Sequence, residues 1–335
     1  MPAPMPASVP ATSVSTTPPA SASPLRGVFV PTLTPVHADG RVHEEEAARL
    51  FAWLIEQGAA GLYPNGSTGE FARLDDDAQN RLLEIAVDAA AGRPVLAGAA
   101  GGTVSQALAR CEAAADRGAT AAAVVAPYYY RLKPDSVEAF YRELAAASPI
   151  DLLLYNIPLF ASPIPVDRIR RLALDCPRIV GIKDSSGDAA VMAEMATTIK
   201  PQRPEFTLLT GWDTQLLTML RLGCDGGTHA SANVAPAEMS ALFEAFAGGD
   251  LARAERIQAP VAALFDAMIG ASDGFEPEFP DGFRMGAAVR GFEIAGGLLP
   301  RSEAQAAGLG RLHDRLGPLV DAIVTAAEPS PTRRP

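Results

Sequence analysis

The feature of this sequence that most constrains its fold is an eightfold alternation between short apolar runs and longer amphipathic segments. Such alternation is typical of repeated βα units. The first four predicted strands are residues 27–35, 60–64, 94–99 and 121–127. The second four are residues 151–157, 179–183, 206–211 and 226–230. Eight such units predict an α/β fold, the (β/α)8 TIM barrel.

The amphipathic segments are long enough for helices. The clearest of them are residues 44–57, 75–91, 104–117, 134–147 and 235–248. Three further helices, an appended bundle, are predicted at residues 251–269, 282–295 and 302–327. A doubly wound open sheet would require G-x-G-x-x-G after the first strand, whereas the glycines of residues 98–102 follow the third strand and favour a tight turn or a close backbone approach. We therefore expect a barrel at residues 25–249 and a C-terminal helical region at residues 250–327.

The two ends of the chain are expected to be disordered tails. Residues 1–24 consist almost wholly of Ala, Pro, Ser, Thr, Met and Val, and a segment of this composition buries too little surface to fold alone. Residues 328–335, EPSPTRRP, are expected to be a second loose end. The first tail lacks the basic start and apolar core of a secretory signal, and no apolar run approaches the roughly 20 residues of a membrane span. The net charge of −11 argues against a nucleic-acid-binding surface. We expect a cytoplasmic protein without nucleic-acid or membrane partners.

Cysteine and histidine spacing predicts neither a disulfide framework nor a metal site. The three cysteines have no C-x-x-C spacing and their number is odd, which fits a reducing compartment. The four histidines lack H-E-x-x-H or other paired spacing. These residues are Cys111, Cys176, Cys224, His37, His43, His229 and His313.

Lys183 is the first candidate catalytic residue. The loops that follow the strands of such a barrel meet at one face, where active sites lie. Lys183 ends the apolar strand IVGIK at this face, and partial desolvation there disfavours its ammonium form. A neutral amine can attack a ketone to form a Schiff base, an electron sink for making or breaking the adjacent carbon–carbon bond. The alternative for a lysine at this position is a solvated side chain that caps the strand.

Two further motifs reach the same face. The loop GSTG at residues 66–69 offers consecutive backbone N–H groups at an expected helix N-terminus and two hydroxyls, which suits a carboxylate, although a plain glycine-rich turn has the same composition. Tyr155 ends the fifth strand, where its phenol can exchange a proton beside Lys183; otherwise it is a packing residue. The convergence of an amine, a phenol and a carboxylate cradle favours the catalytic interpretation.

In order and separation, these residues resemble the N-acetylneuraminate lyase and dihydrodipicolinate synthase family of class I aldolases. The resemblance runs from about residue 25 to about residue 248. The motifs that carry it are Gly66-Ser67-Thr68-Gly69-Glu70, Pro127-Tyr128-Tyr129, Tyr155-Asn156-Ile157-Pro158 and Gly181-Ile182-Lys183-Asp184. It implies a pyruvate-derived 2-keto acid and an aldehyde as substrates, and a Schiff base on Lys183 in place of a metal or organic cofactor.

The resemblance also implies a role for each site residue. Lys183 matches the Schiff-base lysine and Tyr155 the proton-relay phenol. Tyr129 matches a second catalytic tyrosine that extends into the neighbouring subunit's site, which implies a homo-oligomer, commonly a tetramer built as a dimer of dimers. Ser67 and Thr68 match the carboxylate binders, and Asp213 matches a carboxylate that contacts substrate hydroxyls. The full set of expected substrate-binding residues is Gly66, Ser67, Thr68, Asp213, Thr228 and Ser231.

One departure from the family pattern bears on the substrate. The synthase branch has an arginine shortly after its tyrosine motif to hold the aldehyde's carboxylate, but this chain has PLFA at residues 158–161, with Phe160 in the corresponding stretch. Residues 155–158 and 211–213 look more like the lyase and 2-keto-3-deoxy-sugar-acid aldolase branches. We therefore expect cleavage or synthesis of a 2-keto-3-deoxy sugar acid or a similar compound. Dihydrodipicolinate synthesis, dehydration of a 2-keto-3-deoxy acid and a non-catalytic barrel that binds a keto acid are the alternatives.

Overall fold

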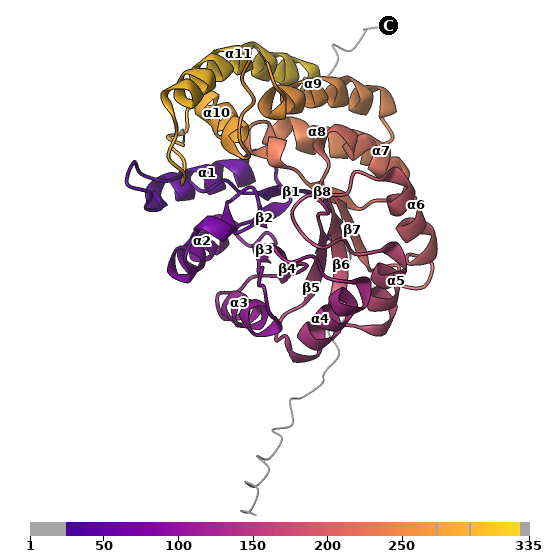
Figure 1. Ribbon diagram of the computed structural model, residues 1–335. Coiled ribbons are helices and arrows are strands. Elements are labelled where there is room, and N and C mark those ends of the chain that lie inside the picture. The colour runs from indigo at the N-terminus through magenta and orange to yellow at the C-terminus, as the bar shows by residue number, and fades with distance from the viewer. Residues whose placement is uncertain (1–24, 273, 295, 329–335) are drawn as a thin grey trace, which may run out of the picture.

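Eight parallel strands form the centre of the molecule (Figure 1). The computed structural model describes residues 25–272, 274–294 and 296–328; the predicted tails, residues 1–24 and all but the first of residues 328–335, lie outside this part. The strands are β1 (Gly27–Pro31), β2 (Gly61–Tyr63), β3 (Leu96–Gly98), β4 (Ala121–Val125), β5 (Leu152–Asn156), β6 (Ile179–Asp184), β7 (Thr207–Thr210) and β8 (Gly226–Thr228). All eight predicted strands are confirmed, each within the predicted range or one residue beyond it.

The strands close into a barrel in the order β2-β1-β8-β7-β6-β5-β4-β3. A parallel bridge between Leu62 and Val95 joins the two ends of this order. Gly98 makes the closure possible, because a side chain at this position would place its Cβ 1.9 Å from the carbonyl oxygen of Asn65. The expected close backbone approach at the glycines of residues 98–102 is therefore present at Gly98, and the predicted (β/α)8 fold is confirmed.

The helices surround the strands because each buries one apolar stripe against them (Figure 1). Around the barrel lie α1 (Glu44–Glu56), α2 (Asp76–Ala89), α3 (Val104–Asp116), α4 (Pro134–Ala147), α5 (Val166–Asp175), α6 (Ala189–Thr198), α7 (Leu216–Arg221) and α8 (Pro236–Ala247). Side-chain caps define several of their starts: Asp75 accepts the N–H of Ala78, and Thr103 accepts the N–H of Gln106.

Three C-terminal helices, α9 (Leu251–Ile269), α10 (Asp281–Val289) and α11 (Glu303–Ala327), pack together beside α8 (Figure 1). A capping box between Ser302 and Gln305 fixes the start of α11. The prediction of one helix over residues 282–295 is wrong in its extent, because the chain leaves the helix after Val289 and Gly291 adopts a φ of 86°. No helix in the described ranges is long and apolar enough to cross a membrane.

Alternation along the strands separates two apolar regions. One set of side chains packs between the strands and the helices, and the opposite set fills the barrel interior. The interior cluster consists of Phe29, Tyr63, Leu96, Ala121, Ala123, Leu153 and Leu209. This packed interior closes the barrel below the polar residues at the strand ends.

Candidate active site

Lys183 lies near the end of β6, where its side chain is only 4% exposed. The β5–β6 register pairs Lys183 with Tyr155, so both residues occupy the same level of the barrel. The Lys183 Nζ lies 4.2 Å from the centre of the Tyr155 ring and 4.8 Å from the centre of the Tyr63 ring. The two tyrosines therefore surround the amine with aromatic faces and keep it largely out of water.

A hydroxyl pair lies beside the amine. The Tyr155 hydroxyl is 3.3 Å from the Ser67 Oγ, and either oxygen can be the donor. Tyr155 is 3% exposed, and the Tyr63 ring meets it edge to face at 6.3 Å. Burial, with a smaller contribution from Tyr155, raises the pKa of Tyr63 well above its usual value, so Tyr63 stays protonated next to Lys183. The site therefore combines an amine with a phenol and an alcohol that can exchange a proton.

The loop at residues 66–69 presents two backbone donors to this site. The N–H groups of Gly69 and Glu70 bond within the loop, to the carbonyls of Gly66 and Ser67. The N–H groups of Ser67 and Thr68 donate to nothing in the described part of the chain, which leaves them available to a carboxylate. The expectation of a helix N-terminus here is wrong, because the loop leads only into a single 3-10 turn, η1 (Phe71–Arg73).

An open cavity of about 760 Å³ lies above Lys183, within the usual size range of small-molecule sites. The side chains that give it polar groups on the strand side are Ser67, Thr68, Arg73, Tyr155, Lys183, Ser185, Asp213 and Thr228. Its opposite wall is largely apolar and includes Phe160, Phe265, Met268, Phe279 and Phe283. The cavity therefore brings together Lys183, Tyr155, Ser67, Thr68, Asp213 and Thr228, all six predicted from the sequence.

Asp213 connects the loops after β7 and β8. Its Oδ1 accepts the N–H of Ser231 at 2.7 Å, and its Oδ2 lies 3.7 Å from the Nδ1 of His229. Ser231 is fully buried and is not among the residues that line the cavity, so the structure places it behind Asp213. Thr228 lines the cavity, and its buried hydroxyl has no hydrogen-bond partner in the described part of the chain. Asp213 and Thr228 are thus the polar groups opposite the Ser67 loop.

Tyr129 lies apart from this chain's own cavity. Its side chain is 90% exposed, and its φ of 73° is in the left-handed region, which a tyrosine rarely adopts. Its ring packs edge to face on that of Tyr130, 4.9 Å away. Gly66 is close to the site without lining the cavity, because it packs on the Tyr63 ring, which a Cβ at this position would approach to 3.3 Å.

Asp184, the residue after Lys183, holds the strand ends in place. Its Oδ1 accepts the side-chain N–H of Asn156 at 2.6 Å, and its Oδ2 accepts the Ser186 hydroxyl at 2.6 Å. Burial raises the pKa of Asp184 above its usual value, while these two hydrogen bonds act in the opposite direction. The network ties β5 to β6 and so fixes Tyr155 relative to Lys183.

On the strand side of the site, the structure adds four residues to which the sequence reasoning assigned no individual role: Tyr63, Arg73, Ser185 and Gly211. The alternation of strand side chains carried a signal for two of them, because Ser185 lies two residues after Lys183 and Tyr63 lies in a predicted strand. Gly211 is needed for space, since its Cβ would lie 2.0 Å from the Ser185 Oγ and 3.1 Å from the Lys183 Cε. Arg73 had no such signal.

A (β/α)8 barrel that buries one lysine beside a tyrosine and a serine at the ends of its strands has the architecture of a class I aldolase or lyase. Residues 24–276 match the dihydrodipicolinate synthetase family. The chain belongs to this family, and it is an enzyme, one of the pyruvate-dependent class I lyases and aldolases. In the described residues, no group of three His, Cys, Asp or Glu side chains is arranged to hold a metal ion.

Similar proteins include both synthases and aldolases. The 4-hydroxy-tetrahydrodipicolinate synthase of Oleidesulfovibrio alaskensis is 34% identical over 72% of this chain and 82% of its own length. The probable 2-dehydro-3-deoxy-D-pentonate aldolase YjhH of Escherichia coli is 32% identical over 71% of this chain and 80% of its own. Among solved structures, Escherichia coli YagE in complex with pyruvate is 27% identical, with a TM-score of 0.81 over 88% of this chain and 98% of YagE.

Proposed function

We propose that this enzyme is a Schiff-base aldolase that joins pyruvate to an aldehyde, or cleaves the product, a 2-keto-3-deoxy sugar acid. The observation that carries the proposal is the buried Lys183 amine, 4.2 Å from the ring of Tyr155, whose hydroxyl lies 3.3 Å from the Ser67 Oγ. The name of YjhH supports the sugar-acid class, and the pyruvate complex of YagE supports pyruvate. Phe160, in the stretch where the synthase branch has its arginine, also favours the aldolase branch.

The reaction begins when the neutral Lys183 amine attacks C2 of pyruvate, and loss of water gives a protonated imine. The N–H groups and hydroxyls of Ser67 and Thr68 hold the pyruvate carboxylate. The Tyr155 phenol, in contact with the Ser67 hydroxyl, gives a proton to the departing hydroxide. The Tyr155 phenolate left by this step takes a proton from C3, which produces the enamine. The enamine attacks the aldehyde carbon, and Tyr155 returns the proton to the aldehyde oxygen, which becomes the 4-hydroxyl. Asp213 and Thr228 bind product hydroxyls, and water then releases the keto acid and free Lys183.

Borohydride reduction in the presence of pyruvate tests this proposal directly. The expected result is one reduced pyruvate per chain, attached to Lys183 in the peptide map. Lys133, which is exposed, and Lys200, which is paired with Asp225, are internal controls for non-specific modification. A chain that stays unmodified at saturating pyruvate, or that is modified equally at all three lysines, contradicts the proposal.

4-Hydroxy-tetrahydrodipicolinate synthesis is the second candidate, because it is the activity named for the 34% identical relative. Dehydration of a 2-keto-3-deoxy acid is possible from the same imine. Product analysis separates the three reactions. Condensation of pyruvate with aspartate semialdehyde identifies the synthase, release of pyruvate from a 2-keto-3-deoxy acid identifies the aldolase, and loss of water without release of pyruvate identifies the dehydratase.

We propose that Tyr129 acts in the site of a second copy of this chain, within a homo-oligomer. The exposed ring, the left-handed backbone at Tyr129 and its absence from this chain's cavity support a role outside its own subunit. A symmetric dimer would give each site one tyrosine from its partner. The tetramer built from two such dimers is the larger assembly that the family resemblance implies.

Mixing two inactive variants tests the shared site. Tyr129→Ala and Lys183→Ala are expected to be nearly inactive alone, and mixing after reversible dissociation should restore about a quarter of the wild-type activity. The reason is that half of the dimers are then mixed, and each mixed dimer contains one intact site. Sedimentation of each variant checks that it still assembles. Failure to restore activity in mixtures that do contain mixed dimers would show that Tyr129 has no role across the interface.

A cytoplasmic location is part of the same proposal. The three cysteines, Cys111, Cys176 and Cys224, are free thiols, which fits a reducing compartment. Burial raises the pKa of Cys111 and of Cys224 to about 12, so both stay protonated and unreactive at neutral pH.

A further inference from the structure

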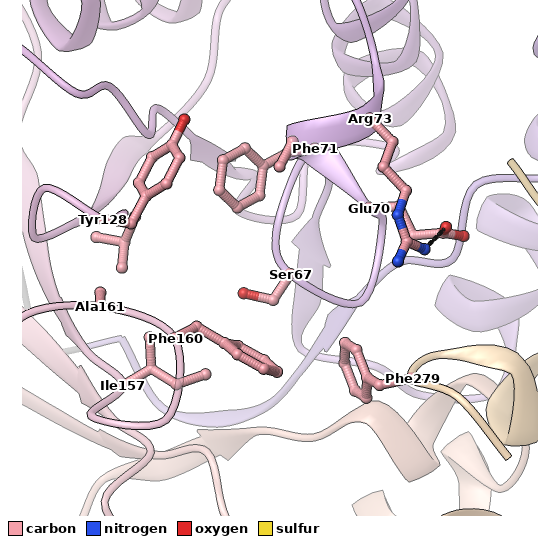
Figure 2. Close-up of a pocket in the computed structure, with 11 residues that line it drawn as sticks. Ser67, Glu70, Phe71, Arg73, Tyr128, Ile157, Phe160, Ala161 and Phe279 are labelled. Atoms are coloured by element: carbon pink, nitrogen blue, oxygen red, sulfur yellow. Dashed lines mark hydrogen bonds and ion pairs between the residues drawn. The ribbon is translucent and has the colours of Figure 1, made fainter. Parts of the chain in front are cut away.

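Arg73 lines the same cavity as Lys183, but it comes from the segment after β2, whereas Lys183 comes from β6. It ends the 3-10 turn η1, after the loop that carries Ser67, and its side chain is 35% exposed. Arg73 lines the main cavity and also a smaller adjoining one of about 260 Å³ (Figure 2). Both cavities also share Ser67, Ile157, Phe160 and Phe279. A molecule bound at Lys183 can therefore extend past Ser67 toward Arg73.

Arg73, Glu70 and Arg284 form a cluster of charged side chains with a net charge of one positive unit. Glu70 is buried and pairs with two guanidinium groups: Arg284 bonds its Oε1 and Arg73 bonds its Oε2. One carboxylate between two guanidinium groups leaves one positive charge. Arg284 is fully buried, so Arg73 is the member of this cluster that a ligand can reach. The bond to Glu70 uses the Nη1 of Arg73, and within the described residues Nε and Nη2 have no acceptor, so both can donate to a ligand.

The surroundings of Arg73 favour binding of an anion. Figure 2 places Ser67 between the rings of Phe71 and Phe160, with Phe279 to the right of Phe160 and below the Glu70–Arg73 pair. Apolar walls exclude water and strengthen the attraction between a guanidinium and an anion. Three carboxylates line the main cavity. Asp213 is buried and accepts the N–H of Ser231, whereas Glu276 and Glu278 are exposed to solvent, which screens their charges. Glu278 also accepts a hydrogen bond from Gln305 at 2.9 Å.

We propose that Arg73 binds an anionic group at the far end of the aldehyde that the Lys183 enamine attacks. The substrate class is then an aldehyde with a carboxylate or phosphate, and the product is a 2-keto acid with a second anionic group. Phe160 lines both cavities with Arg73, so Arg73 supplies from another loop the positive charge that residues 158–161 lack. This inference rests on the proposed aldol chemistry at Lys183.

Two matched pairs of aldehydes test the inference: glyceraldehyde 3-phosphate against glyceraldehyde, and succinic semialdehyde against butanal. With pyruvate saturating, the wild type is expected to favour the anionic member of at least one pair in kcat/KM, and the preferred pair identifies phosphate or carboxylate. Arg73→Gln should lower that preference about 10- to 100-fold, the usual effect of losing a charge-assisted hydrogen bond. Arg73→Lys, which keeps the charge, should recover part of it.

Arg81→Gln is the matched control, because Arg81 is an exposed residue of α2 that pairs with Glu44 and Glu84 and does not line either cavity. Its preference between the aldehydes should equal that of the wild type. If the wild type forms the imine with pyruvate but has no preference for anionic aldehydes, or accepts none of the four, the role of Arg73 is wrong and the Lys183 chemistry stands. An equal loss with both members of a pair in Arg73→Gln also overturns it. If no imine forms, the proposed function itself fails.

Discussion

Replacing Lys183 by alanine is expected to lower kcat for pyruvate-dependent carbon–carbon bond formation at least about 1,000-fold, since the variant loses the nucleophile and with it the covalent electron sink. The fold should persist, because the Lys183 side chain donates no hydrogen bond in the described part of the chain and packs on the rings of Tyr155 and Tyr63. Steady-state kinetics measures the loss, and circular dichroism checks the fold.

Tyr155→Phe distinguishes loss of the proton relay from loss of the nucleophile. This variant keeps the ring beside Lys183 and removes only the hydroxyl that meets Ser67. We expect it still to form a pyruvate adduct on Lys183 under borohydride, with kcat lowered about 100- to 10,000-fold, the usual range for a general acid–base group. Lys183→Ala should form no adduct. Residual turnover of Lys183→Ala above one tenth of wild type would rule out an obligatory imine.

The strands and the central catalytic pair could be predicted because local patterns determine them. Short apolar runs bounded by glycine and proline identify strands, and a lysine that ends such a run must lie at the barrel mouth. Consecutive strands of a barrel are neighbours, so the ends of β5 and β6 bring Tyr155 next to Lys183 without any long-range information. The end of α10 was less predictable, because the apolar pattern continues beyond the glycine at which the chain turns.

The second half of the cavity could not be predicted, because it depends on contacts between distant parts of the sequence. Phe279 and Phe283 follow Lys183 by about a hundred residues, yet they cover the same cavity. Arg73, at the edge of the cavity, pairs with Glu70, and Glu70 pairs in turn with Arg284, which lies 214 residues further along the chain. No periodicity or motif relates such positions; only the packing of the C-terminal helices against the barrel does.

The Glu70–Arg284 pair couples the barrel to these helices. Both side chains are almost fully buried, and the Arg284 Nε donates to the Glu70 Oε1 at 3.0 Å while Nη2 bonds the same oxygen. Arg284 also donates to the carbonyl of Ile294 at 3.3 Å. A guanidinium in this position is tolerated because a carboxylate compensates its charge, and removal of that carboxylate would leave a buried charge with no counterion.

Glu70→Gln is therefore expected to lower the free energy of unfolding by about 3–5 kcal/mol, the usual cost of breaking a buried ion pair. Glutamine keeps the shape and the left-handed backbone of residue 70, so the loss reports on charge. Urea denaturation measures it. The double variant Glu70→Gln with Arg284→Met removes both charges and should lose less free energy of unfolding than Glu70→Gln alone. Arg81→Gln, which breaks only exposed ion pairs, is the control and should leave the urea midpoint unchanged. If the double variant is the less stable of the two, Arg284 is held by its packing and by Ile294, and the charge of Glu70 is not what anchors α10 to the barrel.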